Sequence, residues 1–145
     1  MYQEYEILLI GQQLKKLLEK KSLPIMVKYD LRKVELDILS FLDYSSEGDT
    51  AKDIMLTKHI SKAHVSKSVD NLKKRGYIQL REDKEDHRKF HISLTESGVS
   101  VLHEFLKIRN ECKEILFRNI TQGEKAVLNQ VLEKMQDNIN IELDK

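Results

Sequence analysis

The segment Val65–Gly98 constrains the fold of this chain more than any other part of the sequence. It opens with a helical pattern in which Val65, Val69 and Leu72 share one face, and Gly76 follows as a residue that can take the left-handed turn at a helix end. Two runs of alternating apolar and polar residues come next, separated by the wholly charged sequence EDKEDHR. Such alternation around a charged connection predicts two strands joined in a hairpin whose tip lies in water.

Capping signals extend this pattern in both directions. Thr50 followed by Asp53 predicts a short helix ending near Met55, and Ser61 is a good N-cap for the helix that carries Val65. Thr95 begins a long helix that we expect to end near residue 119. Two consecutive helices, a hairpin and a further helix are the order found in a winged helix-turn-helix, so the sequence predicts a mainly α fold with a small β-hairpin wing.

Further helices are predicted on both sides of this lobe. Residues 3–21 carry a helical apolar stripe that Leu23-Pro24 should end, Asp30 is a candidate N-cap for the next helix, and residues 45–48 form a loop. A T-x-x-E capping box at residues 121–124 begins a last helix. We therefore divide the single chain 1–145 into a DNA-binding lobe, 30–98, and helical dimerisation regions, 1–24 and 99–145.

The charge of the chain is sorted by region. The net charge is only +1, with 34% charged and 40% hydrophobic residues, one Pro and five Gly, so nucleic-acid binding must come from a local patch. Between residues 58 and 75 there are six Lys and Arg side chains and one acid, whereas residues 121–145 carry three basic and five acidic side chains. The basic patch therefore coincides with the second helix of the predicted helix-turn-helix.

This second helix is the candidate recognition helix. A helix that enters the major groove needs small and polar exposed residues near its N-terminus so that the backbone can approach the base edges. An ordinary solvated, Lys-rich helix would look similar when taken alone, and its place between a capped helix and a hairpin favours DNA. The residues that we expect to contact DNA from this helix are Ser61, Lys62, Ala63, His64, Ser66, Lys67 and Asn71.

Two motifs in the hairpin region resemble a known family. Asp86-His87-Arg88 has the form D-x-R, and Leu94-Thr95-Glu96-Ser97-Gly98 has the form L-T-x-x-G at the spacing of MarR-type winged helix-turn-helix regulators. The resemblance implies that Arg88 enters the minor groove, with Asp86 supporting the wing, and Lys89 is a further DNA-contact candidate from its charge. The sequence departs from the family at Leu80, where many members have Arg, so an Arg–Asp pair at the base of the wing is not implied.

The resemblance implies a transcriptional regulator, most often a repressor, that binds a pseudo-palindromic site on double-stranded DNA as a homodimer. A small-molecule effector between the dimer helices and the DNA-binding lobes is implied by analogy only. Two alternatives stay open: a regulator resembling the SarA-type branch, which has no such effector, and a winged-helix module that binds a protein partner instead of an operator.

Other kinds of site find no support in the sequence. No nucleophile motif, phosphate loop or acid–base pair is recognisable, so we expect neither an enzyme nor a cofactor. Cys112 lies on an apolar helix face and is expected to be a buried structural residue rather than a redox sensor. We expect exposed polar roles for His87 and His91 rather than a metal between them. The acidic N-terminal sequence does not resemble a signal peptide, so we expect a cytoplasmic protein without a membrane segment.

Overall fold

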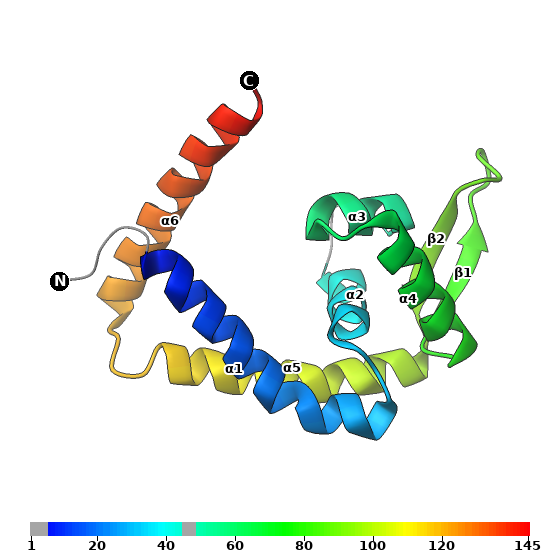
Figure 1. Ribbon diagram of the computed structural model, residues 1–145, viewed down its shortest axis with the longest axis horizontal. Helices are drawn as coiled ribbons and strands as arrows, with labels where there is room; N and C mark the ends of the chain where they lie inside the picture. The colour runs from blue at the N-terminus through cyan, green and yellow to red at the C-terminus, as the bar shows by residue number, and fades with distance from the viewer. Residues whose placement is uncertain (1–5, 45–48) are drawn as a thin grey trace. The chain divides into compact units, whose positions relative to one another are not determined.

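A computed structural model describes residues 6–44 and 49–145 of the chain (Figure 1). The described residues form six helices and one two-stranded antiparallel sheet, in the order α1 (Glu6–Tyr29), α2 (Lys33–Tyr44), α3 (Ala51–Lys58), α4 (Lys62–Lys74), β1 (Ile78–Glu82), β2 (Phe90–Leu94), α5 (Glu96–Leu116) and α6 (Gln122–Leu143). This confirms the predicted mainly α winged helix-turn-helix fold. The loop predicted at 45–48 and the start of the first helix lie outside the described residues. None of the described helices is long and apolar enough to cross a membrane.

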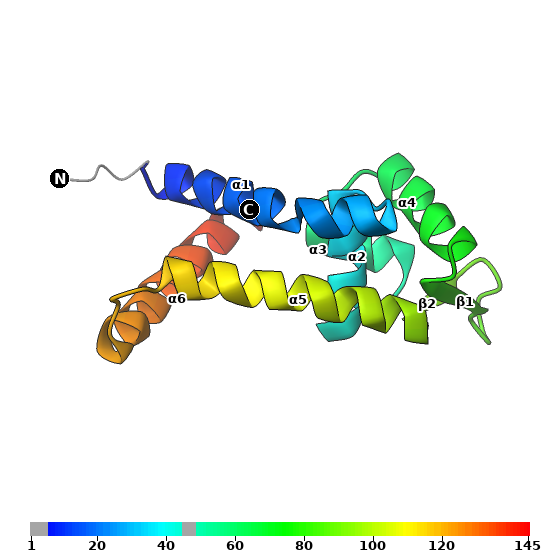
Figure 2. The ribbon, with the colours of Figure 1, turned by 90° about the horizontal axis from the view of Figure 1, so that it is seen from below.

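The chain divides near the C-terminal end of α5 into two compact units, residues 1–112 and 113–145. In the first unit, α2, α3, α4 and the hairpin gather beside the N-terminal part of α5 (Figures 1 and 2). Every one of these elements contributes apolar side chains to a single core. Its fully buried members include Leu36, Leu39, Phe41, Ile54, Val65, Leu72, Val101, Leu102 and Phe105. This core packs the helix-turn-helix and the base of the hairpin together.

The end of the first helix differs from the prediction. α1 continues through Pro24 to Tyr29, so the expectation that Leu23-Pro24 ends this helix was wrong. A proline inside a helix removes one backbone hydrogen bond, but the turn that contains it also buries Ser22 and Ile25, and the packing of Ile25 in the core offsets that cost.

Asp30 ends α1 rather than beginning α2, so its predicted N-cap role was also wrong. It has a φ of 50°, and the amides of Asp30 and Leu31 donate to the carbonyls of Val27 and Met26 at 3.3 and 2.9 Å. This is the paired hydrogen-bond pattern of a Schellman motif. Aspartate tolerates the left-handed conformation better than most residues, because its short polar side chain can hydrogen-bond locally.

The helix-turn-helix follows its predicted capping signals. The Thr50 hydroxyl accepts from the Asp53 amide and the Asp53 carboxylate accepts from the Thr50 amide, so both halves of a capping box begin α3. α3 extends beyond the predicted end, to Lys58. Ser61 caps α4 by accepting from the His64 amide, and Gly76, with a φ of 78°, ends it in a second Schellman motif. The recognition-helix candidate therefore has the boundaries that its sequence indicated.

The hairpin pairs β1 with β2 in a register that places Ile78 opposite Leu94 and Arg81 opposite His91. The L-T-x-x-G motif then joins the hairpin to α5. The Thr95 amide donates to the Tyr77 carbonyl at 3.1 Å, and the Thr95 hydroxyl donates to the Gly76 carbonyl and accepts from the Gly98 amide. Thr95 thus caps α5 and fixes the base of the hairpin at the same time.

The second unit contains the end of α5 and the whole of α6. Thr121 and Glu124 form the predicted capping box, with the Glu124 amide donating to the Thr121 hydroxyl at 3.1 Å. No residue of α6 is buried. Its exposed large apolar side chains include Leu128, Leu132, Met135 and Ile139, which recur at helical spacing. An exposed apolar stripe of this size is unusual for a helix in water and is typical of an interaction surface.

Candidate nucleic-acid interface

The N-terminal half of α4 presents most of the predicted DNA-contact residues to solvent. Val65, Ser68, Val69 and Leu72 face the core, so this helix cannot turn about its axis. The side chains left on the outer surface are Ser61, Lys62, Ala63, His64, Ser66 and Lys67, all of them exposed. Five of the six carry side-chain hydrogen-bond donors, namely the hydroxyls of Ser61 and Ser66, the ammonium groups of Lys62 and Lys67, and the His64 ring. None of the six is bulkier than Lys, so the helix backbone can approach a flat polar surface closely.

Asn71 stands apart from these residues because it is partly buried. Its side-chain amide donates to Oε2 of Glu35, and Oε1 of the same carboxylate accepts from the Arg32 amide at 3.1 Å. Glu35 is only 2% exposed. Both carboxylate oxygens of this buried acid are therefore satisfied, one by the start of α2 and the other by α4. The structure gives Asn71 a structural contact that the sequence pattern did not indicate.

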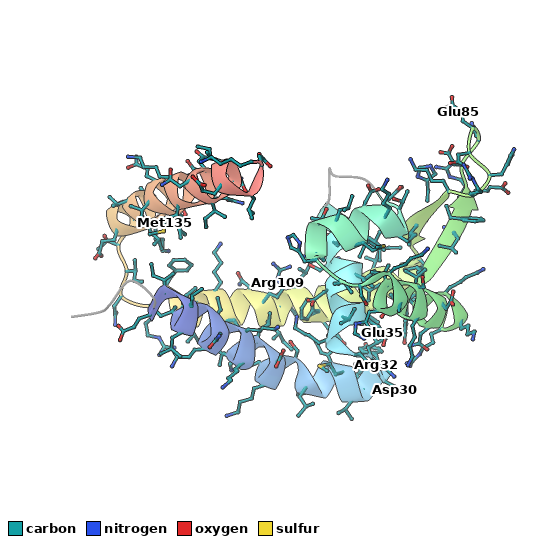
Figure 3. The ribbon with its side chains drawn as sticks, turned by 45° about the horizontal axis from the view of Figure 1, so that its top comes forward. Asp30, Arg32, Glu35, Glu85, Arg109 and Met135 are labelled. Atoms are coloured by element: carbon teal, nitrogen blue, oxygen red, sulfur yellow. The ribbon has the colours of Figure 1, made fainter. Side chains whose placement is uncertain are left out.

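Acidic side chains at the tip of the wing accept hydrogen bonds from the backbone amides of the same turn. Asp86 Oδ1 accepts from the Arg88 amide at 3.0 Å and lies 3.4 Å from Arg88 Nε. The Arg88 side chain is 93% exposed. Lys89 is also exposed, and its amide donates to the Asp86 carbonyl at 3.0 Å. The guanidinium of Arg88 is thus presented to solvent from a turn that Asp86 organises. Figure 3 shows Glu85 at the far end of this turn.

An acid–histidine cluster joins the wing to the helix-turn-helix, and the sequence pattern did not predict it. His91 Nδ1 lies 2.6 Å from Asp49 Oδ1, and His91 Nε2 lies 2.6 Å from Asp83 Oδ1. The His91 side chain is 23% exposed, so the expected exposed role was wrong for His91, whereas it was right for His87, which is 79% exposed. The alternating strand pattern gave no sign of Asp49, because that residue lies before α3.

Electrostatics support this cluster. The hydrogen bond to Asp49, followed by that to Asp83, raises the pKa of His91 above its ordinary value of 6.5. The hydrogen bond from His91 and those donated by the amides of Asp86 and Glu85 lower the pKa of Asp83. Both shifts favour a charged pair at neutral pH.

Arg75 connects the end of α4 to the end of α1. Its guanidinium donates to the backbone carbonyls of Tyr29 and Asp30 and lies over the Tyr77 ring, 5.6 Å from the centroid. The Tyr29 and Tyr77 rings meet edge to face at 6.4 Å. An Arg is well suited to this place, because its planar fork can satisfy two terminal helix carbonyls together.

A polar groove of about 420 Å³ lies between the α1–α2 turn and α4. Arg32, Glu35, Lys67, Asp70 and Lys74 contribute charged side chains to its lining. Figure 3 shows Asp30, Arg32 and Glu35 close together at one side of α4. The mixture of acids and bases in this groove does not select one class of ligand.

Other candidate chemistry is weak. Among the described residues, no group of three His, Cys, Asp or Glu side chains is placed to hold a metal ion. Cys112 is buried, as predicted, and a buried thiol lacks the access that redox sensing needs. The best-developed arrangement in the first unit is therefore the exposed face of α4 together with the wing.

Comparison with known proteins identifies this arrangement. The model of the MarR family matches residues 29–89, which include α2, the helix-turn-helix, β1 and the tip of the wing. The chain is 35% identical over 75 residues to the transcriptional repressor MprA of Escherichia coli K12, covering 52% of this chain and 43% of MprA. It is 31% identical over 78 residues to the repressor NicR of Pseudomonas putida, covering 54% of this chain and 49% of NicR. The chain thus spans less than half the length of these curated relatives.

Solved structures show the same fold over nearly the whole chain. A MarR protein from Peptoclostridium difficile superposes with a TM-score of 0.79 at 23% identity, covering 98% of this chain and 92% of that protein. The MepR protein of S. aureus, in a complex with DNA, superposes with a TM-score of 0.75 at 23% identity, covering 95% and 98%. The names of the matching curated relatives denote transcriptional regulators and repressors, not enzymes. Residues 29–89 thus match the MarR family, and the chain has the fold of MarR winged helix-turn-helix proteins.

Proposed function

We propose that this protein binds double-stranded DNA in a sequence-specific manner as a homodimer and acts as a transcriptional regulator, most simply a repressor. The observation that carries this proposal is the exposed N-terminal face of α4, which is fixed by core packing and carries Lys62, His64 and Lys67. Such a face can enter a major groove with its backbone close to the base edges. The relatives MprA and NicR are named repressors, and MepR was solved bound to DNA.

Each element has a separate part in the proposed complex. The α4 residues Ser61, Lys62, Ala63, His64, Ser66 and Lys67 form the major-groove contact, with Asn71 at the rear of the helix. Arg88 enters the adjacent minor groove, supported by Asp86, and Lys89 contacts the phosphate backbone. A guanidinium is suited to the minor groove, because a narrow groove concentrates negative potential.

The homodimer is proposed from unpartnered apolar surface. α6 exposes Leu128, Leu132, Met135 and Ile139, and the first turns of α1 expose Ile7 to Ile10. A second copy that covers these faces would remove them from water and give the protein the two-fold symmetry that a pseudo-palindromic site requires. We assign the dimerisation region to 1–24 and 99–145 and the DNA-binding lobe to 30–98.

The cellular setting and the effector follow from the family. A regulator of this kind acts on chromosomal DNA, so we propose a cytoplasmic location. A small-molecule effector that alters the spacing of the two recognition helices is proposed by analogy with the family alone. Thermal unfolding with and without small phenolic acids tests it, because a ligand that binds the folded state raises the Tm. A regulator of the SarA type would show no such shift.

Selection from random-sequence duplexes tests the DNA proposal directly. The purified full-length chain is mixed with the duplex library at about 0.15 M salt, and the retained DNA is sequenced. We expect an enriched palindrome with half-sites about one helical turn apart. Salt-sensitive retention without enrichment would contradict sequence-specific binding. Absence of retention would instead favour a winged-helix module that binds a protein partner.

A further inference from the structure

A continuous chain of hydrogen bonds connects the start of α3 to the tip of the wing. It begins at Asp49, which precedes the α3 N-cap and binds β2 twice: its carbonyl accepts from the Ile92 amide at 3.0 Å, and its carboxylate binds the His91 ring. The opposite side of that ring binds Asp83. His91 is therefore the only side chain in this chain of contacts that bridges the helix-turn-helix and the wing tip.

Asp83 links His91 to the turn that presents Arg88. Its Oδ2 accepts from the amides of Glu85 and Asp86 at 3.0 and 2.9 Å, and its own amide donates to the Lys89 carbonyl at 2.8 Å. Asp86 then accepts from the Arg88 amide. The position of the Arg88 backbone thus depends on a carboxylate that His91 holds in place.

The protonation state of His91 follows from this geometry. A neutral imidazole has one N–H and can donate one hydrogen bond, whereas both ring nitrogens of His91 lie 2.6 Å from carboxylate oxygens. Both contacts are satisfied only by the doubly protonated imidazolium. When the ring loses a proton, one nitrogen lone pair faces a carboxylate, and that contact becomes repulsive.

We propose that His91, as an imidazolium, is a positioning residue that clamps the wing to the start of α3 and releases it as the pH rises. The charged groups that face the ring are Asp49 from the segment before α3, Asp83 from the wing and Arg81 from the opposite strand. The two acids favour the imidazolium and Arg81 opposes it. The clamp is intact below the ordinary histidine pKa of 6.5, and it is lost as the pH rises through the higher pKa of the folded protein.

The effect of releasing the wing on DNA affinity rests on the proposed function. A loosened wing must be ordered again when Arg88 meets DNA, and the free energy of that ordering lowers the affinity. We therefore expect DNA affinity to fall by about fivefold between about pH 6 and about pH 9. This decrease is no larger than the decrease in affinity expected when the Arg88 contact is removed altogether.

The first experiment needs no DNA and tests the clamp itself. The ring signals of the five histidines of the full-length protein are followed by NMR across the pH range, with His91 assigned by its loss in His91→Gln. We expect His91 to titrate above 6.5 and its midpoint to fall in both Asp49→Asn and Asp83→Asn. Backbone order parameters of Asp86 and Arg88 should fall toward the flexible range, below about 0.6, as His91 deprotonates. Titration at or below 6.5, or a wing tip whose order does not change, would overturn the clamp.

The second experiment measures DNA affinity against pH by fluorescence anisotropy, using a labelled duplex taken from the selection. The matched control is His87→Gln, which removes a histidine of the same hairpin whose ring lies against Glu82. We expect His87→Gln to follow the wild-type profile and His91→Gln to bind weakly with a flat profile. Equal pH slopes for wild type and His91→Gln would overturn the link to DNA, even with a normal NMR titration. Failure to bind any duplex would count against the proposed function as well, and the NMR result would still report on the clamp.

Discussion

The side-chain amide of Asn71 donates a hydrogen bond to the carboxylate of Glu35, so a buried acid of α2 is satisfied by the C-terminal half of α4. Glu35 is 2% exposed, and its second oxygen is occupied by the Arg32 amide. The orientation of the recognition helix is therefore fixed by a polar contact in addition to apolar packing. Removing either partner would leave a buried polar group without a hydrogen bond.

Asn71→Ala should destabilise the fold. The substitution leaves Glu35 Oε2 unpaired in the interior, and we expect a loss of about 1–3 kcal/mol in the free energy of unfolding. Urea unfolding at one fixed protein concentration measures it. Lys67→Ala, on the exposed side of the same helix, is the control and should change the stability by less than about 0.5 kcal/mol. Weaker DNA binding by Asn71→Ala at unchanged stability would instead assign Asn71 to the DNA contact.

Arg88→Ala should weaken DNA binding without affecting the fold, because the side chain is 93% exposed. We expect the slope of log K against log salt to become shallower by about 0.9, as one contact to the DNA charge is lost. Salt titrations by fluorescence anisotropy measure this slope. Lys84→Ala removes the same charge from the same hairpin tip and should leave the slope nearly unchanged. Equal effects of the two substitutions would show that the wing contributes only general charge.

Gly98→Ala should be strongly destabilising. A Cβ at this position would lie 2.1 Å from the Tyr77 carbonyl oxygen, which also accepts the Thr95 amide at the base of the hairpin. Because the obstacle is backbone, relief requires a shift of α5 or of the hairpin, and we expect a cost of about 3 kcal/mol.

Gly11→Ala is the matched control, because nothing lies within 4 Å of the added Cβ. Alanine is the better helix former, so this substitution should stabilise the protein by up to about 1 kcal/mol. Urea unfolding of both variants gives the comparison. A Gly98→Ala variant as stable as the wild type would contradict the close approach of α5 to Tyr77.

Arg75→Ala should loosen the connection between α1 and α4. The variant loses two charge-assisted hydrogen bonds to the terminal carbonyls of α1, Tyr29 and Asp30, and we expect a cost of about 2 kcal/mol. Arg75→Lys keeps the charge but lacks the planar fork, so it should recover only part of this stability. Lys73→Ala, at an exposed position of the same turn, serves as the control in thermal unfolding. Full recovery by Lys would show that charge alone matters.

Leu132→Glu should shift the proposed dimer toward monomer. Leu132 is 45% exposed in the single chain and lies in the apolar stripe of α6. A carboxylate buried at an interface without a partner is costly, so dissociation should appear at micromolar protein concentration. Sedimentation equilibrium measures the mass. Gln130→Glu adds the same charge at an exposed polar position of the same helix and should leave the mass unchanged. A wild-type chain that is monomeric throughout would contradict the dimer.

Features that depend on one helical turn were predicted well. The capping residues Thr50, Ser61 and Thr121 and the terminal Gly76 all have their predicted roles, because a cap is a contact between residues three or four positions apart. The hairpin was also predicted, since strand alternation shows in the sequence itself. The errors at Pro24 and Asp30 arose where tertiary packing overrode a local preference, with Ile25 buried on the turn that contains the proline.

The sequence by itself therefore determined the order of the elements, the caps of the recognition helix and the exposed position of Arg88. Only the tertiary structure decided which polar groups meet across the fold. Asn71 and Glu35 are 36 positions apart, and His91 and Asp49 are 42 apart, so no pattern within one element could pair them. Such contacts form because a shared apolar core brings distant helix faces and strand ends together. The geometry of that packing cannot be predicted from the hydrophobic periodicity of one helix or strand.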